Sequence, residues 1–137
     1  MVAQDKILIP TGGRGIFDIT ERIKKLVQNC NIKNGLCHIF CQHTSCSLIL
    51  CENFDDSVKI DIETYLSDLV IDGDKRFTHI AEGKDDMSAH IRTMLTQSEV
   101  SVPIVDNQLF LGQWQGINLY EHRYYNHNRE LMVTLMG

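Results

Sequence analysis

The segment from His79 to His90 combines two histidines with three carboxylates. Asp86 and His90 are four residues apart, so on a helix their Cβ atoms lie on one face, about 6 Å from each other. A carboxylate and a neutral imidazole are suited to holding a divalent metal ion or to transferring a proton. This segment is therefore the strongest sign of a chemical site in the sequence.

His90 lies beside the apolar side of the helix that we predict from about Asp86 onwards. That side is formed by Met87, Ile91, Met94 and Leu95. We therefore expect the His90 ring to point inward, where an unpaired polar group costs about 1–3 kcal/mol. Asp86 is one candidate partner for the ring. A divalent metal ion, zinc or a similar ion, is the other, with His43 and His79 as further ligands.

Helix capping is an alternative explanation for part of this segment. Asp85 or Asp86 is expected to cap the start of the helix, which accounts for one carboxylate without any chemistry. A capping aspartate and a solvated loop would also explain much of the remainder. The number of carboxylates is therefore weaker evidence for a chemical site than it first suggests, and His90 is the most informative residue.

Two polar segments outside this region are candidates for substrate binding. Thr44 and Ser45 follow His43 at the end of an apolar strand, and their hydroxyls suit a phosphate or a carboxylate. Asn53 precedes a predicted helix whose free N–H groups attract anions. A strand end with one hydrogen-bonded histidine, and an ordinary helix start, are the alternative explanations.

A predicted strand near the C-terminus contains Gln115 and leads to Glu121. On an unbroken strand these two residues share one face but lie about 20 Å apart, so they cannot both contact one small ligand. A bulge at Gly116 would change this spacing. Otherwise one of the two serves a different subsite or a subunit interface. Trp114 suits packing in a core or an interface, with stacking on a ligand as the alternative.

The polar stretch 121–129 is predicted to be a surface turn. It contains His122 and His127 together with Arg123 and Arg129. Its aromatic and basic residues are also candidates for the mouth of a site.

Three predicted helices alternate with strands before a final series of strands. Strands are predicted at 6–9, 36–42, 45–51, 100–105, 108–111, 113–120 and 130–136, and helices from 19 to about 29, after 55 and from about 86. Asp18 is expected to cap the first helix, and Asp55, Asp56 and Ser57 are candidate N-caps of the second. The second helix has an apolar stripe at 58, 62, 65, 66 and 69, and Asp106-Asn107 is typical of a hairpin turn. This order predicts a single α+β domain over 1–137, with about three helices and a mixed or mainly antiparallel sheet.

The composition excludes several classes of protein. The chain has 137 residues, a net charge of −5 and 43% hydrophobic residues, which suits an ordinary globular domain. Because no block of like charge is present and no apolar run could span a bilayer, we expect neither a nucleic-acid nor a membrane partner. The five cysteines form no Cys-x-x-Cys pair, so we expect small, buried, reduced thiols in the cytoplasm rather than a zinc–thiolate site.

Taken together, these segments resemble the YjbQ-type family, whose members are often labelled secondary thiamine-phosphate synthases. The resemblance rests on the segments 43–45, 52–55, 79–83, 86–90 and 111–117, followed by Glu121, in the same order over nearly the whole chain. It implies an α+β fold of its own type, a homotrimer, and a cluster of His43, His79, Asp86 and His90 around a divalent metal. It also implies catalytic roles for Asp86, His90 and Glu121.

The activity that this resemblance implies is a weak one. It joins the diphosphate of hydroxymethylpyrimidine to thiazole phosphate and releases pyrophosphate, with Thr44, Ser45, Asn53 and Gln115 as the residues that bind the small phosphorylated substrate. Two departures from the family pattern are Asp56, where proline is frequent, and the loop 122–128. A metal-dependent hydrolase of a small phosphorylated or acyl substrate, and a non-catalytic trimeric module that binds a metal or a small anion, are the alternatives.

Overall fold

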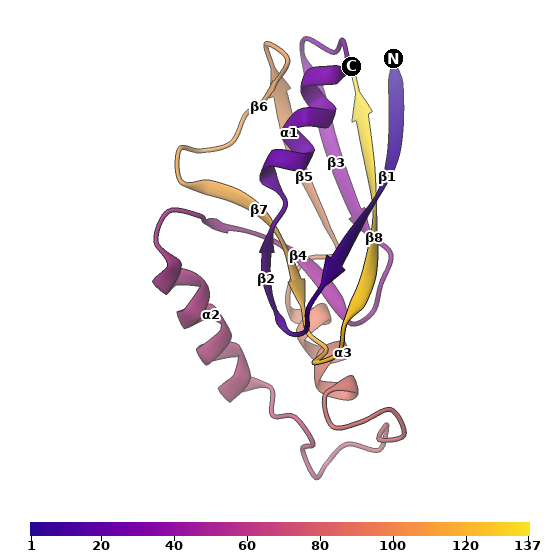
Figure 1. The fold of residues 1–137 in the computed structure, drawn as a ribbon, viewed down its shortest axis with the longest axis vertical. Coiled ribbons are helices and arrows are strands. Elements are labelled where there is room, and N and C mark those ends of the chain that lie inside the picture. Colours follow the sequence, from indigo (N-terminus) through magenta and orange to yellow (C-terminus); the bar gives the residue numbers. More distant parts are fainter.

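The eight strands of the computed structural model, which describes residues 1–137, form two antiparallel sheets (Figure 1). The larger sheet contains, in spatial order, β1 (Val2–Thr11), β8 (His127–Met136), β3 (Gly35–Cys41), β5 (Glu99–Val105) and β6 (Gln108–Leu109). The smaller sheet contains β2 (Gly15–Asp18), β7 (Gln115–Glu121) and β4 (Cys46–Glu52). The predicted α+β class is confirmed, and every neighbouring pair of strands is antiparallel.

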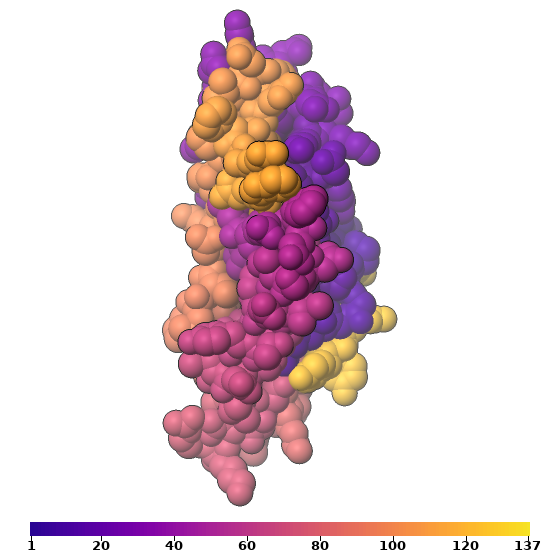
Figure 2. Space-filling view, turned by 90° about the vertical axis from the view of Figure 1, so that its left-hand side faces the viewer, coloured from indigo at the N-terminus to yellow at the C-terminus, as the bar shows by residue number.

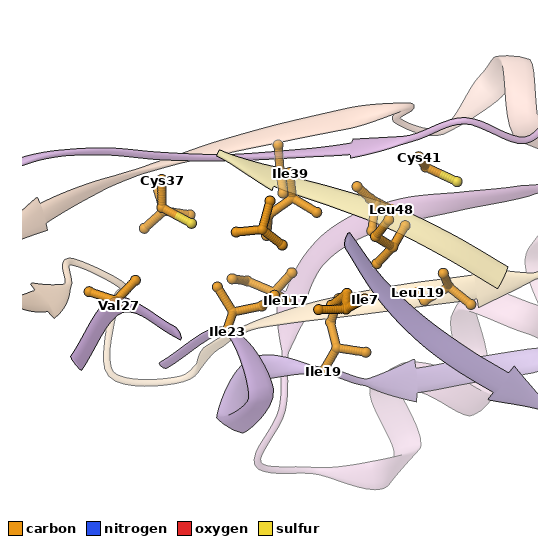
Figure 3. Packing of buried hydrophobic residues seen from close by; sticks show 14 of the residues in the cluster. Ile7, Ile19, Ile23, Val27, Cys37, Ile39, Cys41, Leu48, Ile117 and Leu119 are labelled. Atoms are coloured by element: carbon orange, nitrogen blue, oxygen red, sulfur yellow. The ribbon is translucent and has the colours of Figure 1, made fainter. Parts of the chain in front are cut away.

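The main hydrophobic core lies between the two sheets and against α1 (Thr20–Asn29), as Figure 3 shows. Its members include Ile7 and Ile39 of the larger sheet, Leu48 and Ile117 of the smaller sheet, and Ile23 of α1. Full burial of an aliphatic side chain of this size stabilises the fold by roughly 1.5–3 kcal/mol. This packing fixes how the two sheets, and the polar residues at their strand ends, lie relative to each other.

Aspartate side chains accept backbone hydrogen bonds at the start of the first two helices. Asp55 is the N-cap of its helix as predicted, whereas Ile19, one residue after the predicted Asp18, is the N-cap of the first helix. Asp18 Oδ1 accepts a hydrogen bond from the backbone N–H of Thr20 at 2.9 Å, at the start of α1. Asp55 Oδ1 accepts one from the N–H of Ser57 at 2.9 Å, at the start of α2 (Asp56–Leu69).

The helices lack the length and the apolar character needed to cross a bilayer.

The apolar stripe of α2 is only partly covered. Leu66 is buried against Val70 and Tyr120, on the side of the smaller sheet that faces away from the main core. Tyr65 and Leu69, which belong to the same predicted stripe, are mostly exposed. The helix lies along the outside of the molecule, where it faces the viewer in Figure 2. The chain therefore leaves part of a predicted core face open to its surroundings.

The third helix, α3 (Asp86–Leu95), turns a different face inward from the one predicted. Met94 is 75% exposed and Leu95 is 53% exposed, so the prediction that they belong to a buried apolar face is wrong. The buried residues of this helix are Asp86, Ser88, Ala89, Arg92 and Thr93. Hydrogen bonds and ion pairs made by the polar members of this face, rather than apolar contacts, orient α3.

Arg92 is the centre of a buried polar network that attaches α3 to the smaller sheet. Its side chain is fully buried and pairs with Glu63 of α2. Its Nη2 donates to the hydroxyl of Tyr120 at 3.0 Å, and its Nε donates to His122 Nδ1 at 3.1 Å. Because Nδ1 accepts, the proton of the neutral ring lies on Nε2, which donates to Ser47 Oγ at 2.8 Å. His122 is thus a buried member of this network, and its predicted place in a surface turn is wrong.

This arrangement predicts that acid destabilises the fold through His122. Burial, followed by the charge of Arg92, lowers the pKa of His122 to about 2 in the folded state, whereas an unfolded histidine titrates near pH 6.5. Below pH 6.5 the unfolded chain therefore binds a proton that the folded chain does not, and stability falls as pH decreases. Between pH 6.5 and 5 the loss from this residue is about 2 kcal/mol.

Urea unfolding of the wild type and of His122→Gln at pH 7 and pH 5 measures this contribution. The variant should lose less stability on acidification than the wild type, because the same change of pH no longer protonates this residue on unfolding. Burial also lowers the pKa of His43, so His43 contributes to the acid sensitivity of both proteins. Its contribution cancels when the loss of stability of the variant is subtracted from that of the wild type. In the wild type, the His122 imidazole should keep the NMR shifts of a neutral ring at pH 4.5. Titration of that ring near pH 6 would contradict the prediction.

Candidate functional site

The candidate site is a group of three side chains, His79, Asp86 and His90, which we call the histidine–aspartate centre. Their ligand atoms all lie within 4.8 Å of one another. Asp86 Oδ2 is 2.8 Å from His79 Nε2 and 3.3 Å from His90 Nε2. The Asp86 side chain is 2% exposed, whereas the side chains of His79 and His90 are 51% and 30% exposed. The centre therefore has a buried carboxylate at its base and two imidazoles that reach solvent.

Two segments supply these side chains. Asp86 and His90 lie one turn apart on α3, so the predicted helical spacing is confirmed. His79 comes from the loop 70–85, which folds back so that the N–H of Gly73 donates to the carbonyl of Lys84 at 2.9 Å. Gly73 has a φ of 65°, a left-handed conformation that glycine adopts without a steric penalty. Closure of this loop brings His79 beside a helix that begins seven residues later.

Arg123, from the segment between β7 and β8, bonds the two carboxylates at the start of α3. Its Nη1 donates to Asp86 Oδ1 at 2.7 Å, and its Nε donates to Asp85 Oδ2 at 2.9 Å. Burial opposes ionisation of Asp85, but hydrogen bonds from the N–H of Tyr124 and from Arg123 outweigh it and lower the pKa of this carboxyl. Charge-assisted hydrogen bonds of this kind are about twice as strong as neutral ones.

The predicted capping role of Asp85 or Asp86 is therefore not realised. Asp85 occupies the N-cap position of α3 but makes no capping hydrogen bond through its side chain. Asp86 bonds Arg123 and the two histidines instead. Asp85 and Asp86, which helix capping was expected to explain, therefore take part in the site instead.

The carbonyl of Thr44 fixes the tautomer of His90. His90 Nδ1 lies 2.8 Å from this oxygen, and a carbonyl only accepts, so Nδ1 must carry a proton and donate it. In the neutral ring, Nε2 then presents a lone pair to Asp86 Oδ2 at 3.3 Å. Two acceptors at that distance need a proton or a cation between them. His90 is also part-exposed, so the expected inward orientation is not found.

Within one chain, the structure does not bring His43, a predicted metal ligand, to this centre. Its Nε2 accepts a hydrogen bond from the backbone N–H of Glu130 at 2.8 Å. Burial and the nearby Arg129 lower the pKa of His43, and its ring accepts from β8 of the larger sheet. The predicted strand end does reach the site, but through the Thr44 carbonyl.

Glu121 lies in a separate, buried ion pair. It is fully buried and pairs with Arg129, while its Oε1 accepts from the hydroxyl of Thr11 at 2.6 Å. Burial raises the pKa of Glu121, but the hydrogen bonds from Arg129 and Thr11 lower it more. Ser45 Oγ accepts from the same arginine at 2.9 Å. The contacts of Glu121 thus connect β7 with β1 and β8, and none is with the histidine–aspartate centre.

Comparison with known proteins agrees with this fold. The sequence matches the family described as UPF0047 protein YjbQ-like over residues 5–137. The chain belongs to this YjbQ-like family. It is 42% identical to a UPF0047 protein of Synechocystis over 134 residues, which cover 98% of this chain and 91% of that protein. It is 37% identical to the UPF0047 protein YjbQ of Salmonella typhimurium over 135 residues, covering 98% and 97% of the two chains.

Solved structures of similar proteins share the whole fold. A YbjQ-like protein of unknown function from Sulfolobus solfataricus superposes with a TM-score of 0.91 at 25% identity, covering 100% of this chain and 98% of that one. A protein of the yjbq/upf0047 family from Clostridium acetobutylicum gives a TM-score of 0.88 at 28% identity, covering 96% and 99%. The YjbQ-like membership is thus supported along the entire chain.

In this YjbQ-like chain, Asn53 and Gln115 lie at the other end of the smaller sheet. The register of β4 and β7 pairs Glu52 with Gln115 and Cys46 with Glu121 without a bulge. Six residues of strand separate the two ends by about 20 Å. The expectation that Gln115 and Glu121 do not share one small ligand is therefore met. Within one chain, the predicted substrate-binding residues divide between two places.

A polar surface pocket of about 300 Å³ surrounds the Asn53 end. Asn53 Nδ2 donates to Asp18 Oδ2 at 2.8 Å and would lie 1.8 Å from a Cβ atom at position 116, so only glycine fits there. Trp114 is 50% exposed and packs against Phe54, with 4.8 Å between ring centroids. It is therefore not a core residue.

Proposed function

We propose that the histidine–aspartate centre binds one divalent cation, zinc or a similar ion, and that the protein is an enzyme that uses it. The observation that carries this proposal is the contact of His90 Nε2, which has a lone pair in the neutral ring, with the Asp86 carboxylate. Nε2 faces the carboxylate of Asp86 at 3.3 Å because Nδ1 is committed to the Thr44 carbonyl. A cation between the two acceptors would turn a repulsive contact into two bonds.

The chemical types of the three residues fit such an ion, and so does one of their spacings. His79 Nε2 is at hydrogen-bond distance from Asp86 Oδ2, 2.8 Å, and would move away from it to make room for the ion. Two ligand atoms about 2.1 Å from a tetrahedral zinc ion lie about 3.4 Å apart, close to the 3.3 Å between His90 Nε2 and Asp86 Oδ2. Two imidazoles and one carboxylate, with one position open, are typical of catalytic rather than structural zinc sites. The Thr44 carbonyl and Arg123 hold the ligands from behind, as outer partners of metal ligands do.

The reaction that we propose is a weak, secondary thiamine-phosphate synthase activity, supported by the family resemblance. A bound divalent cation supplies stabilisation of the negative charge on departing pyrophosphate. Arg123 already bonds two aspartates. Because this arginine is committed to those carboxylates, a diphosphate finds little additional positive charge, which agrees with a low activity.

Titration of chelator-treated protein with zinc tests the proposed cation site. The wild type should bind one ion per chain. Loss of an outer partner of a metal ligand already weakens binding by about 10–100-fold, so His90→Ala should weaken it by more. His43→Ala is the matched control and should bind as the wild type does, because His43 bonds Glu130 instead. A wild type that binds no ion, or equal losses in the two variants, would overturn the proposed ligand set.

Growth of cells that lack thiamine-phosphate synthase tests the proposed reaction. Expression of the wild type at a high level should support slow growth without thiamine, and Asp86→Ala or His90→Ala should not. Cation binding without growth would exclude this reaction. It would favour the hydrolase or the non-catalytic metal-binding module.

We also propose that three copies of this chain associate in the cytoplasm. The family resemblance supports a trimer, and the uncovered apolar residues Tyr65, Leu69, Met94 and Leu95 supply surface that association would bury. The five free thiols suit a reducing compartment. Light scattering coupled to gel filtration should give three times the 15.7 kDa of one chain, and a monomer across micromolar concentrations would contradict the trimer.

A further inference from the structure

Two buried cysteines, Cys41 and Cys46, lie in contact at the strand ends that flank the segment 42–45. Their Sγ atoms are 3.4 Å apart, and the residues are 2% and 0% exposed. A disulfide requires a separation of about 2.05 Å, so the two atoms need to approach each other by only about 1.4 Å. The chain between them is a short turn connecting β3 of the larger sheet with β4 of the smaller one. Ordinary packing as small core residues does not require this sulfur–sulfur contact.

The surroundings give the two thiols different roles. The thiol of Cys46, and then the backbone N–H of His43 and the charge of Arg129, lower the pKa of Cys41, whereas its burial and Glu121 oppose them. The contact with Cys41, together with burial, raises the pKa of Cys46. Either thiol can donate the hydrogen bond between the two sulfur atoms, and we assign the first attack to Cys41, the thiol with the lowered pKa.

We propose that Cys41 and Cys46 form a dithiol site that hydrogen peroxide oxidises to an intramolecular disulfide. The sulfur of Cys41 attacks one peroxide oxygen, so an S–O bond forms, the O–O bond breaks, and hydroxide leaves as water after taking up a proton. The sulfur of Cys46 then attacks the sulfenic acid, so an S–S bond forms, the S–O bond breaks, and the Cys46 proton leaves with the hydroxyl as a second water. Two thiols and one peroxide thus give one disulfide and two waters.

A small neutral oxidant fits this site better than a bulky disulfide does. Both sulfur atoms are covered, but the turn that connects the two cysteines contains the exposed residues Gln42 and Thr44. Hydrogen peroxide is close to water in size, so it needs only a local opening of this turn. Glutathione disulfide would require a mixed disulfide inside the core.

The disulfide would form next to the backbone that contacts α3 and the β7 end. The carbonyl of Thr44 accepts from His90 Nδ1 at 2.8 Å, and the carbonyl of Ser45 accepts from the N–H of His122 at 3.3 Å. Closing the sulfur–sulfur distance shifts the turn that carries both carbonyls. Oxidation should therefore change the NMR shifts of the His90 imidazole, whether or not the centre holds a cation.

Mass spectrometry of the full-length protein tests the proposal. Reduced protein is treated with a small molar excess of hydrogen peroxide, denatured, and alkylated. We expect a product that has lost two hydrogen atoms and retains three alkylatable thiols of the five, with one peptide linkage between positions 41 and 46, reversed by dithiothreitol. Five alkylated thiols after treatment, or a disulfide that joins other cysteines, would overturn the proposal.

Single substitutions separate the two roles. Cys46→Ser should leave Cys41 as a sulfenic acid that dimedone labels, because the second thiol is missing. Cys37→Ser, which removes another buried cysteine of the same core, is the matched control and should form the disulfide at the wild-type rate. If Cys46→Ser is not labelled by dimedone while the wild type is oxidised, Cys41 is not the residue that peroxide attacks first.

Discussion

Replacing Arg92 with alanine is expected to lower the free energy of unfolding by about 3–5 kcal/mol, the cost of breaking a buried ion pair by removing one partner. Arg92 is fully buried and bonds Glu63, Tyr120 and His122 at once. Its loss leaves a buried cavity and removes the donor that His122 Nδ1 accepts from. For a chain of 137 residues this corresponds to a decrease of roughly 10–17 °C in the unfolding midpoint.

Calorimetry of Arg92→Ala and Arg76→Ala measures this effect against a matched control. Arg76 is also an arginine in an ion pair, but it is 88% exposed and bonds only the neighbouring Asp74. Its replacement should leave the midpoint unchanged. Similar decreases in the two variants would show that the Arg92 network does not hold α3 against the smaller sheet.

Asp86→Asn is expected to abolish divalent cation binding at the histidine–aspartate centre with little change in shape. Asparagine keeps the oxygen that can accept from Arg123, but it removes the negative charge that the two histidines face. A hard or borderline divalent ion binds a carboxylate oxygen far more strongly than an amide oxygen. The affinity for zinc should fall by more than the roughly 10–100-fold that loss of an outer partner causes.

Asp85→Asn is the natural control for this experiment. Asp85 is the adjacent residue, is also buried, and also accepts a hydrogen bond from Arg123, at 2.9 Å. Its contacts are with Arg123 and Tyr124 and not with either histidine. Asp85→Asn should therefore bind zinc nearly as the wild type does, even if its stability decreases. Equal losses of affinity in the two variants would mean that general disruption of the segment, rather than a ligand, explains the effect.

Much of the fold was predictable because its signals are local. The Asp106-Asn107 turn is an example: both residues have positive φ, 49° and 62°, as a two-residue hairpin turn requires. Asp55 caps its helix where the sequence predicts, and Asp18 bonds the first residue of α1 from one position before the N-cap. Such features depend on residues within a few positions of each other, which a single sequence displays directly.

The orientation of α3 was not predictable from its apolar residues. Periodicity identified a side of the helix with Met94 and Leu95, but the structure buries Arg92 instead. A buried arginine is stable only where partners from other segments meet it, here Glu63 from α2 and His122 from the end of β7. No pattern within α3 reveals partners that lie about thirty residues away on either side.

The sequence alone determined half of the candidate site. Asp86 and His90 are neighbours because a helix brings residues four apart onto one face, whatever surrounds it. The tertiary structure decided the rest: it added the Thr44 carbonyl and Arg123, and within one chain it placed His43 and Glu121 away from the centre. The physical reason is that contacts between distant segments depend on strand register and on how the two sheets pack. A backbone carbonyl, moreover, has the same chemistry in every residue and leaves no mark in the sequence.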